Sequence, residues 1–234
     1  MSITHHYIEQ GAGEPLVLLH GNGEDGGYFA RQLPAFAPYF RVIAPDTRGH
    51  GRTPRGEAPF TLSQFADDLL VLLDRLGIAR AHLLGFSDGG NIALTFALRY
   101  PERVGKLVLN GANLDPSGVK RSVQRPIELG WRIARAFAGK SGAAGQRTRV
   151  RRKAELLGLM VNEPHFRPEE LSRLTMPVLV IAGDRDMIRE EHTRLIARSI
   201  PGAQLAILPG DHFLAARNPE PFNARVLQFL REKF

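Results

Sequence analysis

The sequence of 234 residues contains no cysteine. Disulfide bonds and thiolate metal ligands are therefore excluded. Long apolar runs are also missing, because the longest ones, such as 16–19 and 178–182, have only the length of a strand. The segment 1–9 lacks the apolar stretch of a signal peptide. We therefore expect a cytoplasmic location and no membrane partner.

The composition is that of a folded protein, with 43% hydrophobic and 24% charged residues. A chain of this length buries a large core without covalent links, and α/β proteins of this size often form one domain. We expect a single domain over residues 1–234.

The formal net charge is +7. A basic balance can indicate nucleic acid or another anionic partner. Here no aromatic residues are interleaved with the basic ones and no known binding module is present, so we expect no nucleic-acid partner. We interpret the densest basic cluster as a solvent-exposed helix face, and the alternative is that it attracts an anionic substrate. The cluster consists of Arg147, Arg149, Arg151, Arg152 and Lys153.

Short apolar segments alternate with longer amphipathic ones along the chain. Alternation of this kind predicts an α/β fold, with a mostly parallel sheet covered by helices on both faces. The predicted strands are 16–20, 42–45, 82–86, 107–110, 178–182 and 204–208, and the predicted helices are 62–76, 91–99, 191–199 and 222–230.

Residues 112–174 interrupt the alternation, because they contain no good strand. Two helical patches, 126–137 and 148–161, are joined by the small-residue tract 139–145. We interpret the segment as a helical excursion from the sheet, since a structureless loop of that length is improbable in a compact protein. The tract 139–145 is predicted to be its most mobile part, because its small side chains bury little surface.

A nucleophile motif occupies residues 85–90, whose sequence GFSDGG fits the pattern G-x-S-x-G. It follows the apolar run 81–86 and precedes the predicted helix 91–99, as the motif requires. Such a turn exposes a serine hydroxyl at the carboxyl end of a strand and at the positive end of a helix dipole. Ser87 is the predicted nucleophile.

A second glycine-rich turn, His20-Gly21-Asn22-Gly23, follows the first buried strand. Turns of this kind can aim backbone N–H groups into a crevice. We predict an oxyanion hole made by the backbone amides of Asn22 and Asp88. His20 is interpreted as a structural residue that holds the loop rather than as a base.

Five motifs in this order resemble the α/β-hydrolase fold superfamily, and the closest similarity is to small bacterial esterase-like, lactonase-like and perhydrolase-like members. The resemblance implies a sheet of about seven strands, since only residues 4–8 can serve for the usual first hairpin, and it implies that 112–174 is a helical cap. The motifs are HGNG at 20–23, DTRGHG at 46–51, GFSDGG at 85–90, VLVIAGDRD at 178–186 and GDHF at 210–213.

The resemblance also implies a catalytic acid after the strand that follows the cap, three residues beyond Gly183, which selects Asp186 over Asp184. Asp184 is expected to make hydrogen bonds within its loop. Among the eight histidines, only His212 follows the final strand and can lie at the sheet edge that carries the serine. In the loop after the second strand, Asp46 and Arg48 are expected to be partners.

The predicted function is hydrolysis of a small carboxylic ester or lactone through an acyl-enzyme, with no cofactor and no metal. Alternatives are C–C bond hydrolysis, perhydrolysis or lyase chemistry on the same triad, or non-enzymatic ligand binding on this fold. The Asp88 side chain either contacts substrate or serves only its loop. The expected partner is a small-molecule substrate, and the sequence leaves the oligomeric state open. Residues proposed to line the pocket are Trp131, Phe137, Leu157 and Met160.

Overall fold

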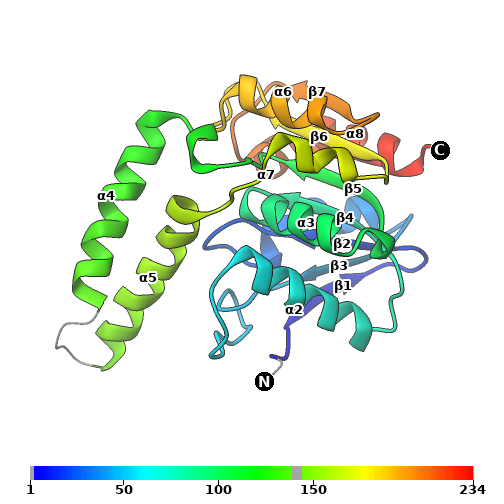
Figure 1. Ribbon diagram of the computed structural model, residues 1–234. Helices are drawn as coiled ribbons and strands as arrows, with labels where there is room; N and C mark the ends of the chain where they lie inside the picture. Colours follow the sequence, from blue (N-terminus) through cyan, green and yellow to red (C-terminus); the bar gives the residue numbers. More distant parts are fainter. Residues whose placement is uncertain (1–2, 139–143, 234) are drawn as a thin grey trace.

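The computed structural model describes residues 3–138 and 144–233, and its centre is a seven-stranded sheet with the strand order β1-β3-β2-β4-β5-β6-β7 (Figure 1). β1 runs antiparallel to β3, and all other neighbours are parallel. The expected fold class is confirmed. The strands are β1 Tyr7–Gln10, β2 Pro15–Leu19, β3 Arg41–Pro45, β4 Ala81–Phe86, β5 Val104–Asn110, β6 Val178–Gly183 and β7 Gln204–Leu208.

The strands are apolar because the sheet is buried on both faces. In β2, Val17 and Leu19 enter one hydrophobic cluster while Leu16 and Leu18 enter the other, and all four are fully buried. Successive side chains of a strand point to opposite faces, so a sheet covered on both sides needs apolar residues at every position. The edge strand β1 differs, since it is half-exposed and begins at Tyr7 rather than at the predicted residue 4.

Helices cover both faces of this sheet (Figure 1). The cluster that contains Val17 is closed by α2, α3 and α6, and the opposite cluster by α1, α7 and α8. Within the described ranges, no helix has the length and apolar character needed to cross a membrane. The helices are α1 Leu33–Phe36, α2 Leu62–Arg75, α3 Asp88–Arg99, α4 Arg121–Ala138, α5 Ala144–Asn162, α6 Glu190–Ser199, α7 Leu214–Arg217 and α8 Pro219–Arg231.

The helices α4 and α5 lie side by side at one end of the molecule, outside the layers that cover the sheet (Figure 1). They correspond to the two helical patches predicted at 126–137 and 148–161, but both are longer. The helix α4 begins at Arg121, so Pro126 lies inside it rather than at its start. Of the tract 139–145, residues 139–143 lie outside the described residues, and its mobility stays a prediction.

Arg48 has a different partner from the one expected. Its guanidinium donates to both carboxylate oxygens of Asp68 in α2, at 2.6 Å each, and both side chains are buried. Asp46 instead accepts hydrogen bonds from the backbone N–H groups of Gly26 and Arg52, at 2.9 and 2.8 Å. The prediction of an Asp46–Arg48 partnership was wrong, because Arg48 reaches α2 while Asp46 accepts bonds from loop backbone.

Candidate active site

Three side chains from distant parts of the chain meet at the carboxyl edge of the sheet. Ser87 directly follows β4, Asp186 lies three residues beyond β6, and His212 lies four residues beyond β7. The carboxyl ends of parallel strands share one edge, so the topology collects residues that are separated by up to 125 positions. The sequence-predicted nucleophile, base and acid are therefore brought together.

The geometry of the three side chains forms a continuous hydrogen-bonded chain. His212 Nε2 lies 3.0 Å from Ser87 Oγ, and His212 Nδ1 lies 2.7 Å from Asp186 Oδ1. Asp186 is held in turn by the backbone N–H of Ile188, which donates to the same Oδ1 at 2.8 Å. With a carboxylate accepting at Nδ1, the neutral ring carries its proton there and leaves Nε2 free to accept one from the serine.

The backbone at Ser87 is strained, with φ = 53°, and no other non-glycine residue of the described ranges has a positive φ. Its neighbours show why. A Cβ on Gly85 would lie 2.2 Å from Gly89 O, and a Cβ on Gly89 would lie 2.0 Å from Leu19 O. The strand and the helix cross so closely that only glycine fits around the serine, and such strain is typical of catalytic turns.

Asn22 and Asp88 face each other across the two loops that border Ser87. The Asn22 side-chain amide donates to Asp88 Oδ2 at 2.7 Å. Within the described part of the chain, the backbone N–H groups of Asn22 and Asp88 have no protein acceptor. Asp88 is the first residue of α3, where N–H groups have no partner inside the helix. Each of the two loops that border Ser87 thus carries one backbone donor without a protein acceptor.

Glu24 is an ionisable residue near the site that sequence reasoning missed. One of its carboxyl oxygens accepts the backbone N–H of Gly21 at 3.1 Å. Burial raises the pKa of Glu24 to about 7, although the bond from Gly21 and the nearby His212 oppose that rise. Only its position in the loop HGNGED could have suggested it, because a glutamate in a loop has no periodic pattern.

A stack of aromatic rings supports the imidazole. The Phe86 ring centroid lies 4.9 Å from that of His212, with the rings tilted, and Phe86 also stacks on Tyr28 at 4.4 Å. Burial raises the pKa of the Tyr28 hydroxyl, and the carboxylate of Glu24 adds to the effect. Packing of this kind limits the rotation of the histidine ring, which must stay aligned with Ser87.

His20 and Asp184 have structural contacts, as the sequence predicted. His20 Nε2 lies 3.0 Å from the backbone N of Thr47, and His20 Nδ1 lies 2.8 Å from Gly21 O. Burial lowers the pKa of His20, so the ring is neutral and joins two loops. Asp184 Oδ1 accepts the backbone N–H of Gly210 at 2.9 Å, which shapes the loop that carries His212. No cluster of three potential metal ligands occurs in residues 3–138 and 144–233.

The four residues predicted to line the pocket belong to α4 and α5. The Trp131 ring packs beside Gly158, and the guanidinium of Arg135 lies 5.2 Å from its centre. Phe137 is 53% exposed. Leu157 packs against Gly130, and Met160 accepts a hydrogen bond from Gln124 through its backbone oxygen. The neighbouring Leu156 contacts the loop after β2, since its backbone oxygen accepts the Asn22 side-chain amide at 2.9 Å.

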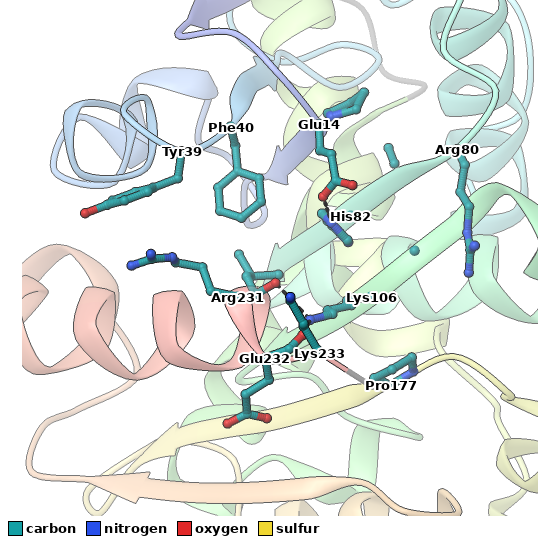
Figure 2. Close-up of a pocket in the computed structure, with 14 residues that line it drawn as sticks. Glu14, Tyr39, Phe40, Arg80, His82, Lys106, Pro177, Arg231, Glu232 and Lys233 are labelled. Atoms are coloured by element: carbon teal, nitrogen blue, oxygen red, sulfur yellow. Dashed lines mark hydrogen bonds and ion pairs between the residues drawn. The ribbon is translucent and has the colours of Figure 1, made fainter.

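A cavity of about 720 Å³ opens at the opposite edge of the sheet (Figure 2). Its lining includes residues near the amino ends of four parallel strands, among them Pro15, His82, Lys106 and Pro177, and residues 230–233 near the carboxyl end of the chain. Lys106 donates to the backbone oxygens of Phe229, Leu230 and Glu232. In an open parallel sheet, ligands bind at the carboxyl ends of the strands, so this cavity is not the candidate site.

A strained serine on a strand-to-helix turn, with histidine and aspartate behind it, defines the hydrolase class of this fold. The chain belongs to the α/β-hydrolase fold family, whose model matches residues 14–132.

Relatives and solved structures agree with this membership. A putative carbamate hydrolase RutD of Rhizobium rhizogenes is 33% identical over 97% of both chains. A 2-hydroxy-6-oxononadienedioate/2-hydroxy-6-oxononatrienedioate hydrolase of Burkholderia vietnamiensis is 34% identical over 97% of this chain and 90% of its own. The enol-lactonase of Burkholderia xenovorans LB400 superposes with a TM-score of 0.81 at 26% identity, covering 98% of this chain and 97% of its own.

Proposed function

We propose that the protein is a serine hydrolase that cleaves a small carboxylic ester or lactone through an acyl-enzyme, with Ser87, His212 and Asp186 as the triad. The single observation that carries this proposal is the hydrogen-bonded chain from Ser87 Oγ through both ring nitrogens of His212 to Asp186. Its support is the strained φ of Ser87, because strain at a buried turn persists only where the surrounding structure enforces it.

The chemical steps follow from this geometry. His212 Nε2 takes the Ser87 proton while Oγ attacks the carbonyl carbon, and the negative charge moves to the carbonyl oxygen. The backbone N–H groups of Asn22 and Asp88 stabilise that oxygen, each by about 10²–10³ in rate. The imidazolium, held by Asp186, returns its proton to the leaving alcohol oxygen. Water then repeats the sequence on the acyl-enzyme and releases the acid.

Residues 112–174 act in this proposal as a helical cap within one domain of residues 1–234. Two polar contacts support the assignment, since Arg55 pairs with Glu155 of α5 at 2.9 and 3.0 Å and Asn22 binds the neighbouring Leu156 carbonyl. A cap tied to the loops around the nucleophile can shape the acyl pocket. Trp131, Phe137, Leu157 and Met160 remain the proposed lining residues.

C–C bond hydrolysis of an anionic substrate is a second candidate, favoured by the charge distribution. The helices α4 and α5 carry nine arginine and lysine residues against two glutamates, while the 22 cationic and 22 acidic residues of the remaining chain cancel. The entire net charge of +7 therefore belongs to the proposed cap. One relative is named as a hydrolase of dienedioate compounds, which are dianions. A substrate of this charge would be attracted by a cationic cap.

The test is covalent labelling with a fluorophosphonate probe, followed by turnover of a substrate panel. The wild-type protein should label at Ser87 and hydrolyse a short-chain nitrophenyl ester with a burst of nitrophenol, while a folded Ser87→Ala variant should do neither. The panel contains an enol-lactone, a carbamate and a dienedioate, and the substrate with the highest kcat/KM identifies the type of bond that is cleaved. Labelling at another residue, with Ser87 unmodified, would sink the proposal.

A further inference from the structure

Asn22 donates both hydrogens of its side-chain amide, and the two acceptors belong to different parts of the fold. One is Asp88 Oδ2 at 2.7 Å, at the start of α3, and the other is the backbone oxygen of Leu156 at 2.9 Å, in α5. A primary amide has only two N–H donors, so this nitrogen is fully used. One side chain thus joins the loop after β2, the nucleophile helix and the proposed cap.

The Asp88 end of this link is anchored in the body of the protein. Asp88 Oδ1 lies 3.5 Å from the Asn91 side-chain nitrogen, and Asn91 is completely buried. Asn91 is fixed by Asn113, which it contacts through one donor and one acceptor at 3.0 Å each. The carboxylate of Asp88 therefore has a defined position against which Asn22 is held.

The Leu156 end is anchored in the cap. The adjacent Glu155 forms a two-point ion pair with Arg55, whose guanidinium also donates to Ala58 O at 2.6 Å and lies 4.9 Å from the centre of the Phe60 ring. A displacement of α5 that breaks this pair also withdraws the Leu156 oxygen from Asn22. The position of the cap therefore affects Asn22, whose backbone N–H is one of the two proposed oxyanion donors.

We propose that the Asn22 side chain is a positioning residue that locks the two oxyanion donors, Asn22 and Asp88, in place and couples their alignment to the position of α5. The inference rests on the proposed function, because it concerns the same oxyanion hole. The side-chain bond joins the same two residues that supply the donors, so the spacing of the two backbone N–H groups depends on it. In this arrangement the Asp88 carboxylate positions the oxyanion donors and does not bind the substrate.

Exchanging the two side chains tests the lock. Asn22→Asp alone opposes two carboxylates and should lower kcat for a neutral nitrophenyl ester about tenfold, with KM within about threefold, as expected for a polar pair in direct contact. The double variant N22D/D88N restores a bond, now donated by residue 88, and should recover most of kcat. If N22D/D88N is as slow as N22D while both melt near the wild-type temperature, the lock is refuted.

The coupling to α5 is tested by adding Glu155→Gln, which weakens the Arg55 pair without changing the site. This change should lower kcat in the wild-type background but not in N22D/D88N, where residue 22 no longer donates to Leu156. Equal effects in the two backgrounds would refute the coupling. Fluorophosphonate labelling of Ser87 is measured in every variant, so a wild-type protein that fails to label contradicts the proposed function and is distinguished from a failed lock.

Discussion

Arg48 and Asp68 form a two-point ion pair in which the side chains are only 1% and 7% exposed. The guanidinium also donates to Arg55 O at 3.0 Å, and Gln64 donates to the Asp68 carboxylate at 3.1 Å. The pair therefore connects the loop after β3, which carries Arg55, to α2 in the body of the protein. A buried charge of this kind is tolerated only while its partner is present.

Removing one member of this pair is expected to destabilise the fold strongly. Asp68→Asn leaves the Arg48 charge buried without its counter-ion, and such changes cost about 3–5 kcal/mol. Urea unfolding followed by circular dichroism measures the loss. The control is Glu190→Gln, which breaks an exposed pair with Arg194 on α6 and should change stability little. Similar effects of the two changes would contradict the role given to the Arg48–Asp68 pair.

Substitutions of the two aspartates in the 183–186 turn should have different effects on kcat. Asp186→Asn removes the acceptor of His212 Nδ1–H and favours the wrong tautomer, so kcat should fall by up to about 10⁴. Asp184→Asn replaces a charged acceptor of Gly210 N–H by a neutral one, which weakens this loop bond, and should mainly lower the melting temperature. Steady-state ester hydrolysis and thermal melting distinguish them. Loss of turnover in Asp184→Asn alone would contradict the assignment of the acid.

Glu24 should make stability depend on pH. Its folded-state pKa of about 7 lies above the value of 4.5 for a free glutamate, so the folded state binds the proton more tightly than the unfolded state. Protonation of Glu24 therefore favours the folded state. This contribution to the free energy of unfolding is complete below pH 4.5 and is lost as the pH rises through 7. Glu24→Gln has no carboxyl to ionise. The melting temperature of this variant minus that of the wild type should therefore increase from pH 5 to pH 8.

The control for the Glu24 experiment is Glu57→Gln, at an exposed position in the loop before α2. This variant should follow the wild-type melting curve at both pH values. A difference between Glu24→Gln and wild type that stays constant from pH 5 to pH 8 would show that the carboxyl of Glu24 does not titrate in this range in the folded protein.

The charge of the proposed cap should act on anionic substrates at a distance. At low ionic strength, kcat/KM for an anionic ester should exceed its value in 0.5 M salt (a concentration at which the screening length is only about 4 Å) by severalfold. A neutral ester of the same size should show little change. Neutralising the exposed Arg149, Arg152 and Lys153 to glutamine should reduce the salt dependence. Equal salt effects on both esters would exclude steering by the cap.

The sequence by itself determined the layers of the fold and the chemistry of its loops. Apolar runs such as 178–182 predict strands buried on both faces, because they are short, bounded by turn residues and apolar at every position. The glycines around Ser87 predict a tight turn, because backbone crossing at this distance excludes a Cβ. These are local properties, carried by neighbouring residues, and the resemblance to a known family added the order of serine, acid and histidine.

Only the tertiary structure decided which side chains are partners. Arg48 pairs with Asp68 rather than Asp46, and Asn22 reaches both Asp88 and Leu156, because strand order and helix packing set these distances and local sequence does not. The raised pKa of Glu24 likewise arises from burial, which depends on what covers the loop. The two contacts of Asn22 join residues that are separated by 66 and by 134 positions in the sequence. Such contacts leave no local pattern, since their free energy depends on the whole fold.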